Sequence, residues 1–110
     1  MHEVREQGIA AALERAVAAV GDGPAFLTVD VDVLDPAYAP GTGTPEPGGM
    51  TPIDLLWACR KAAEGLALVG ADVVEVLPSR IGSTDITALV ADRIVREILT
   101  GIALRRRNDR

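Results

Sequence analysis

Hydrophobic residues recur at helical spacing near the start of the chain and then form an unbroken run. Between residues 3 and 20 the apolar positions fall near one face of a helix: Val4, Ile9, Leu13, Val17 and Val20. The Gly-Asp-Gly-Pro segment 21–24 ends this predicted helix and starts a turn. Residues 25–32 then read as a strand buried on both faces, which is typical of a central strand in a parallel sheet.

Two more helices and a second strand are predicted after a long loop at residues 33–50. Thr51 as N-cap and Pro52 at the first helical position begin a helix that runs to about residue 64 or 65. Its buried positions are Leu55, Leu56, Cys59 and Ala63. Residues 71–76 form a second buried strand, and Ser83-Thr84-Asp85 caps a last long helix. The inner side of that helix carries Ile86, Leu89, Val90, Ile94, Ile98 and Ile102.

The order of these elements is helix, strand, loop, helix, strand, helix. Such an order predicts an α/β fold with a right-handed βαβ crossover and helices covering a parallel sheet. With 110 residues the chain fits one domain and can bury a modest core.

Composition and charge narrow the class of protein. The chain is 48% hydrophobic, 25% charged and only 3% aromatic, so its core must be built from Ala, Val, Leu and Ile. A net charge of −5 argues against a nucleic-acid partner, although arginines gather in the tail at 105–110. The single Cys59 cannot form an internal disulfide. No signal peptide or long apolar span is visible, so we expect a cytoplasmic protein without a membrane partner.

Two acidic residues, Asp30 and Asp32, stand at the end of the first predicted strand. Side chains two positions apart on a strand share a face, so these carboxylates would repel unless a cation pairs with them. A divalent cation is one interpretation, and simple capping of a turn is another. A phosphotransferase of the haloacid-dehalogenase type also has Asp-x-Asp after a strand. Leu34 does not suit that motif, and no lysine follows Lys61 to neutralise a phosphoryl group.

The longer string around these aspartates resembles a known family. Residues 30–36 read DVDVLDP and residues 39–46 read APGTGTPE, followed by Gly48-Gly49. This string resembles a signature of the ureohydrolases, the arginase and agmatinase family, and its PGTGTPE wording is more similar to agmatinases. A second match lies in the strand-like segment 71–78, ADVVEVLP, which contains Glu75.

The resemblance implies a three-layer α/β/α fold in which residues 1–110 are the C-terminal part of a ureohydrolase domain. It implies dinuclear manganese (Mn²⁺) chemistry that hydrolyses a linear guanidine, agmatine or a similar compound, to urea and an amine. Asp30 and Asp32 match metal ligands, Thr44 and Glu46 match pocket-lining positions, and Glu75 matches the acid that binds the guanidinium group. The same resemblance implies a homo-oligomer in the full-length protein.

The chain also departs from the family pattern. Two further ligand segments of the family, of Gly-Gly-Asp-His and Asp-Ala-His-x-Asp type, are absent, and the only histidine, His2, matches no ligand position. Two carboxylates cannot hold a dinuclear site alone. We therefore expect the isolated chain to be inactive and its chemistry to belong to a longer agmatinase-like protein. The alternative is a catalytically inert module that packs with a complete ureohydrolase or with itself.

Overall fold

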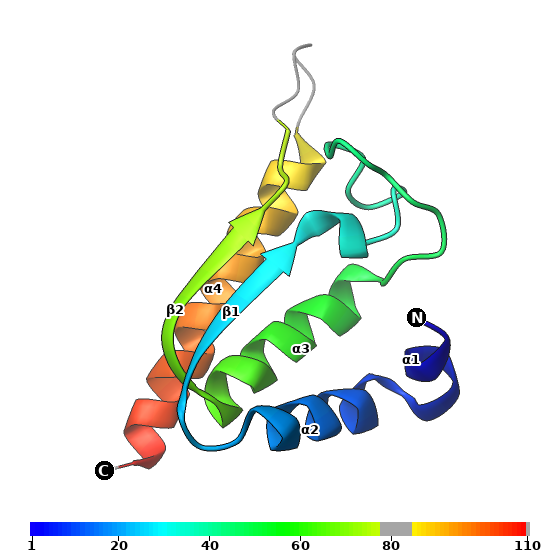
Figure 1. Cartoon of the computed structure of the whole chain (residues 1–110). Coiled ribbons are helices and arrows are strands. Elements are labelled where there is room, and N and C mark those ends of the chain that lie inside the picture. Colours follow the sequence, from blue (N-terminus) through cyan, green and yellow to red (C-terminus); the bar gives the residue numbers. More distant parts are fainter. Residues whose placement is uncertain (78–84, 110) are drawn as a thin grey trace.

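The computed structural model describes residues 1–77 and 85–109 (Figure 1). Its elements are α1 (His2–Gln7), α2 (Ile9–Val20), β1 (Pro24–Asp30), a 3-10 turn η1 (Val31–Val33), α3 (Pro52–Gly65), β2 (Ala67–Val74) and α4 (Ile86–Asn108). Apart from the split first helix, this is the predicted order of helices and strands. Pro78, Ser83 and Thr84, which the sequence analysis singled out, lie outside the described residues.

The predicted first helix is two helices, because Gly8 interrupts it. Gly8 has φ 85°, a left-handed backbone conformation that ends α1 and redirects the chain into α2. Its amide still donates to the carbonyl of Val4 at 2.8 Å, which satisfies one orphan acceptor at the end of α1. The apolar spacing on both sides of Gly8 was correctly helical, but the prediction of one continuous helix is wrong.

Strands β1 and β2 are neighbours and run parallel, as predicted. Their register pairs Thr28 with Asp72 and Asp30 with Val74. The bounds differ from the prediction: β1 ends at Asp30, and β2 runs over residues 67–74. The first strand ends early because the Asp30 side chain accepts the amide of Asp32 and turns the backbone into η1.

Helices α3 and α4 pack on each other and on one face of the sheet, the face that carries Val29. The buried apolar cluster combines residues of β1, the loop and both helices: Val29, Val31, Leu34, Ala39, Met50, Leu55, Cys59, Ala63, Ile94 and Ile98. The two helices approach closely at Gly101, where an added Cβ would lie 2.5 Å from the carbonyl oxygen of Arg60. A glycine is therefore required at this crossing.

The caps of these helices agree only partly with prediction. Pro52 is the first residue of α3 as expected, but the Thr51 side chain makes no capping hydrogen bond. Asp85 does cap α4, since its carboxylate accepts the amide of Ala88 at 3.2 Å.

The opposite face of the sheet is exposed, so the prediction of strands buried on both faces is wrong for the described chain. Phe26 is 60% exposed and Val69 is 74% exposed. No helix in residues 1–77 or 85–109 covers this face. The start of α4 is also more open than predicted, since Ile86 and Leu89 are exposed while Ile94 and Ile98 are buried. In the described chain, apolar residues of the sheet face and of the start of α4 are thus open to solvent.

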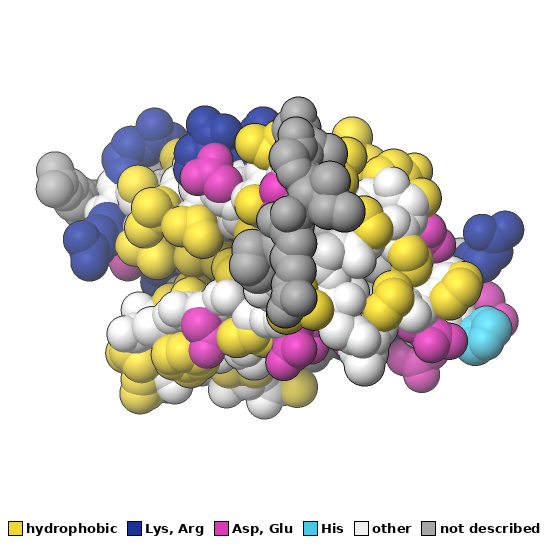
Figure 2. Space-filling view, turned by 90° about the horizontal axis from the view of Figure 1, so that it is seen from above, with side chains coloured by type: hydrophobic (Ala, Val, Ile, Leu, Met, Phe, Trp, Pro, Cys, Tyr) yellow, Lys and Arg dark blue, Asp and Glu magenta, His cyan; other side chains and the backbone are white. Residues whose placement is uncertain are grey.

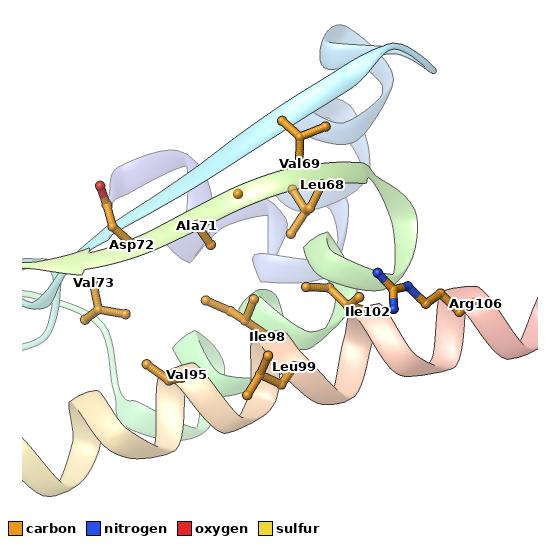
Figure 3. Close-up of a pocket in the computed structure, with 11 residues that line it drawn as sticks. Leu68, Val69, Ala71, Asp72, Val73, Val95, Ile98, Leu99, Ile102 and Arg106 are labelled. Atoms are coloured by element: carbon orange, nitrogen blue, oxygen red, sulfur yellow. The ribbon is translucent and has the colours of Figure 1, made fainter.

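An apolar groove of about 320 Å³ runs between β2 and α4 (Figure 3). Ala71 and Val73 reach into it from the strand, and Val95, Ile98 and Leu99 reach into it from the helix. None of the predicted site residues lines this groove. Within the described chain, no helix is both long enough and apolar enough to cross a membrane.

Candidate functional site

The two parallel strands bring Asp30 and Glu75 to the same end of the sheet. Asp30 is the last residue of β1, and Glu75 directly follows Val74, the last residue of β2. Because Asp30 and Val74 are partners in the register, the two acids leave neighbouring strands at the same level. This end of a parallel sheet is where open α/β folds place their ligands.

Asp30 and Asp32 are linked differently from what the sequence predicted. Asp32 lies in η1 rather than on the strand, so the argument from alternating strand faces is wrong for this pair. Instead, Oδ1 of Asp30 accepts the backbone amide of Asp32 at 2.9 Å. Oδ2 of Asp32 in turn accepts a hydrogen bond from Oγ1 of Thr44 at 3.1 Å. Both half-buried aspartates are thereby fixed at the exit of β1, with Thr44 brought beside them.

The loop that follows is closed at its base by backbone bonds and by Asp35. The amide of Met50 donates to the carbonyl of Val33 at 2.8 Å, and the amide of Asp35 donates to the carbonyl of Met50 at 3.0 Å. The Asp35 carboxylate also accepts the amides of Ala37 and Gly48. These backbone bonds, from Ala37 first and then Gly48, lower the pKa of Asp35.

Gly49 lies where the two ends of this loop meet. An added Cβ would lie 2.5 Å from the Asp35 amide nitrogen and 2.6 Å from the Val33 carbonyl oxygen. Only glycine allows this approach, which explains one of the two adjacent glycines in the motif.

The tip of the loop carries the other predicted pocket residues. Thr44 and Glu46 are exposed there, so their side chains are accessible to a ligand. Thr42 is buried, and its hydroxyl has no hydrogen-bond partner in the described part of the chain. Figure 2 looks onto this end of the molecule, where acidic and hydrophobic side chains intermingle and the basic side chains gather mainly along one side.

Sequence reasoning did not identify Thr87 as part of this region. Its side chain is fully buried, and its Oγ1 accepts the amide of Gly41 at 2.8 Å. The carbonyl of Gly41 accepts the amide of Leu77, also at 2.8 Å. The loop is thus tied to α4 and to the segment that bears Glu75. A threonine in the first turn of a helix gives no sequence signal for such a long-range bond.

The fit of a metal ion can be judged from the donor set. Asp30 and Asp32 provide hard carboxylate oxygens, which suit divalent cations such as Mn²⁺. However, no group of three or more His, Cys, Asp or Glu residues among residues 1–77 and 85–109 is arranged to hold a metal ion. Within the described residues, the two aspartates therefore supply the donors of only part of a metal site.

The family profile described as "Arginase family" matches residues 1–101. This chain belongs to the arginase family. The guanidinopropionase of Pseudomonas aeruginosa is 50% identical to it over 104 residues, which is 94% of this chain and 32% of the relative. The agmatinase of Chromobacterium violaceum is 43% identical over 96 residues, 87% of this chain and 29% of the relative.

Solved structures support the arginase-family fold. The crystal structure of a hypothetical agmatinase from Burkholderia thailandensis superposes with a TM-score of 0.86 at 44% identity. It covers 97% of this chain, whereas the chain covers 33% of that structure. The predicted fold class, an arginase-like α/β fold present as a partial domain, is confirmed. The chain spans about a third of the length of the arginase-family relatives it matches.

Proposed function

We propose that this chain supplies part of the active site of an agmatinase-like ureohydrolase, an enzyme that hydrolyses a linear guanidine to urea and an amine. The observation that carries the proposal is the placement of Asp30 and Glu75 at one end of two paired parallel strands. The printed names of the similar proteins, agmatinase and guanidinopropionase, support the guanidino class of substrate.

Asp30 and Asp32 are the proposed metal ligands of this chain. Their position at the end of β1, fixed by the Asp32 amide and the Thr44 hydroxyl, suits carboxylates that must hold a cation without rearranging. Bound Mn²⁺ would acidify water and stabilise negative charge near neutral pH. The ligands missing from this chain are proposed to lie in other segments of the complete enzyme, of which we propose residues 1–110 to be the C-terminal part.

Glu75 is the proposed guanidinium-binding acid. A carboxylate accepts two parallel N–H bonds from a planar guanidinium, which fixes orientation as well as pairing charge. Glu75 is exposed in the described structure and therefore accessible to such a ligand. Thr44 and Glu46, both exposed on the loop, are proposed to line the same pocket. The substrate is thus a cationic guanidino compound such as agmatine.

A chimera tests this proposal. The matching stretch of the Chromobacterium violaceum agmatinase is replaced by this chain, and urea release from agmatine is measured with added Mn²⁺. We expect Asp32→Ala to abolish activity because a metal ligand is lost. Glu75→Gln should mainly raise KM, and kcat/KM should fall by roughly 30- to several-thousand-fold, as for the loss of a charge-assisted bidentate pair.

Glu14→Gln provides the matched control, since Glu14 is exposed on α2 and lies in no part of the proposed site. It should leave kcat and KM unchanged. An active chimera in which Glu75→Gln has no effect would refute the guanidinium assignment, and retained activity in Asp32→Ala would refute the metal assignment.

A further inference from the structure

Glu75 has an unusual backbone conformation. Its φ is 69°, and it is the only non-glycine residue among those described with a positive φ. In this left-handed region the Cβ atom crowds the backbone, so residues other than glycine, asparagine and aspartate rarely adopt it. Such a conformation persists only where the surrounding structure imposes it, and it concentrates at functional sites.

The chain is held on both sides of Glu75. On the preceding side, Val74 is paired with Asp30 in the sheet. On the following side, the amide of Leu77 donates to the carbonyl of Gly41 at 2.8 Å. Glu75 lies between these two fixed points, and it is the residue at which the backbone takes the left-handed conformation.

Gly41 is itself held by Thr87. Its amide donates to Oγ1 of Thr87 at 2.8 Å, and Thr87 is 0% exposed. There is no space for a side chain at Gly41, since a Cβ atom added there would lie 2.8 Å from Oγ1 of Thr87 and 3.0 Å from the carbonyl oxygen of Leu77. The Thr87 hydroxyl is the acceptor for the half-buried Gly41 amide, so loss of the hydroxyl would leave this backbone donor unpaired.

We infer that Thr87 is a positioning residue for Glu75: through Gly41 and Leu77 it holds Glu75 in the left-handed conformation that directs its carboxylate. The inference rests on the proposed function, in which the Glu75 carboxylate binds the guanidinium group of the substrate. Two hydrogen bonds, from the Gly41 amide to Thr87 and from the Leu77 amide to Gly41, connect α4, the loop that bears Thr44 and the segment after β2. Thr87 touches no substrate in this account and acts only through the backbone it fixes.

Residue-resolved hydrogen exchange on the 110-residue chain tests the first part of this inference. Thr87→Val removes the hydroxyl at nearly constant shape, and exchange of the Gly41 and Leu77 amides should accelerate about five- to hundredfold, because the Gly41 amide loses its acceptor and the bond from Leu77 loses its support. Thr87→Ser keeps the hydroxyl and should stay within about threefold of the parent chain. Unchanged exchange at Leu77 in a folded Thr87→Val chain would overturn the inference.

Thr100→Val is the matched control on the same helix. The Thr100 hydroxyl donates to the carbonyl of Arg96 within α4 at 2.8 Å and has no role in tying the loop. Its loss should leave Gly41 and Leu77 unchanged. Equal acceleration by Thr87→Val and Thr100→Val would show a general effect on α4 and would also overturn the inference.

A second pair of variants tests the conformation of Glu75 even if Thr87→Val does not fold. Glu75→Gly relieves the left-handed strain, whereas Glu75→Ala removes the charge and keeps the strain. Exchange at Leu77 should therefore be about two- to tenfold slower in Glu75→Gly than in Glu75→Ala. Equal rates would overturn the inference. These measurements do not depend on urea release, so they can fail or succeed separately from the proposed function.

Discussion

The carboxylate of Asp35 accepts the amide of Gly48 at 3.0 Å, across thirteen positions of the chain. The same carboxylate accepts the amide of Ala37 at 2.9 Å. Asp35 therefore joins the two ends of the loop that brings Thr44 to Asp32.

We expect Asp35→Ala to loosen this loop without unfolding the helices. Hydrogen exchange at the Gly48 and Ala37 amides should accelerate, while amides in the middle of α4 keep their protection. Asp35→Asn is the control, because its amide oxygen can still accept one of the two bonds, and its effect should be smaller. Equal protection of Gly48 in all three chains would contradict this role for Asp35.

Glu97 makes stability depend on pH at the acid end. Its side chain is 8% exposed and accepts from Arg60 at 2.5 Å and from Arg93 at 3.1 Å. The hydrogen bond from Arg60, assisted by that from Arg93, lowers the pKa of Glu97 against the opposing effect of burial. The corresponding stabilisation is present above the unfolded-state pKa of about 4.3 and is lost as pH falls through the lower folded-state value.

Chemical denaturation of Glu97→Gln measures this contribution. At pH 7 we expect the free energy of unfolding to fall by about 1–2 kcal/mol, a value reduced for the half-exposed arginines. The difference from the parent chain should shrink as the pH is lowered from about 5 to 3, since Glu97 then also becomes neutral. Glu64→Gln, which breaks the half-exposed ion pair with Lys61, should lower the free energy of unfolding less than Glu97→Gln does. A pH-independent difference would contradict the account.

Gly101 sets the distance between α3 and α4. A Cβ there would lie 2.7 Å from the Ala63 Cβ as well as close to the Arg60 carbonyl. Gly101→Ala should therefore lower the free energy of unfolding by about 1–3 kcal/mol despite the better helix propensity of alanine. Gly65→Ala, whose added Cβ would make ordinary contact with Val17, should be neutral or slightly stabilising in the same denaturation experiment. The reverse order would contradict the close-packing argument.

The exposed edges of the sheet and the apolar groove between β2 and α4 should make the isolated chain self-associate. Exposed strand edges and apolar grooves favour association with another chain, and Leu99 on the groove is 60% exposed. Leu99→Lys should shift the chain toward monomer in sedimentation velocity. Leu89→Lys, on the same helix but outside the groove, should have less effect. A parent chain that sediments as a monomer and unfolds cooperatively would contradict this prediction.

Local sequence patterns were sufficient for the order of elements and for the end of the sheet at which the acids lie. Helical spacing, Pro52 at a helix start and two apolar runs act over short stretches of chain, so they can be read directly. The early end of β1 could not be predicted from the apolar run, because the strand stops where the Asp30 side chain accepts the backbone amide of Asp32. Alternation alone does not predict such a competing local bond.

The remaining features depend on residues far apart in the sequence. Asp35 with Gly48, and Thr87 with Gly41, pair only after the loop has folded back. The apolar content of the strands indicated covering on both faces, yet one face is exposed in the described chain, as Phe26 shows. The chain spans about a third of the length of the arginase-family relatives that it matches.

Urea release measured in parallel for the isolated chain and for the agmatinase chimera tests the central claim most directly. With the same Mn²⁺ and agmatine, we expect no urea from the 110-residue chain, since Asp30 and Asp32 are its only proposed metal ligands. The chimera, which adds the segments that this chain lacks, should produce urea. Urea from the isolated chain, or a folded manganese-loaded chimera that produces none, would contradict the claim that these residues form one part of a divided ureohydrolase site.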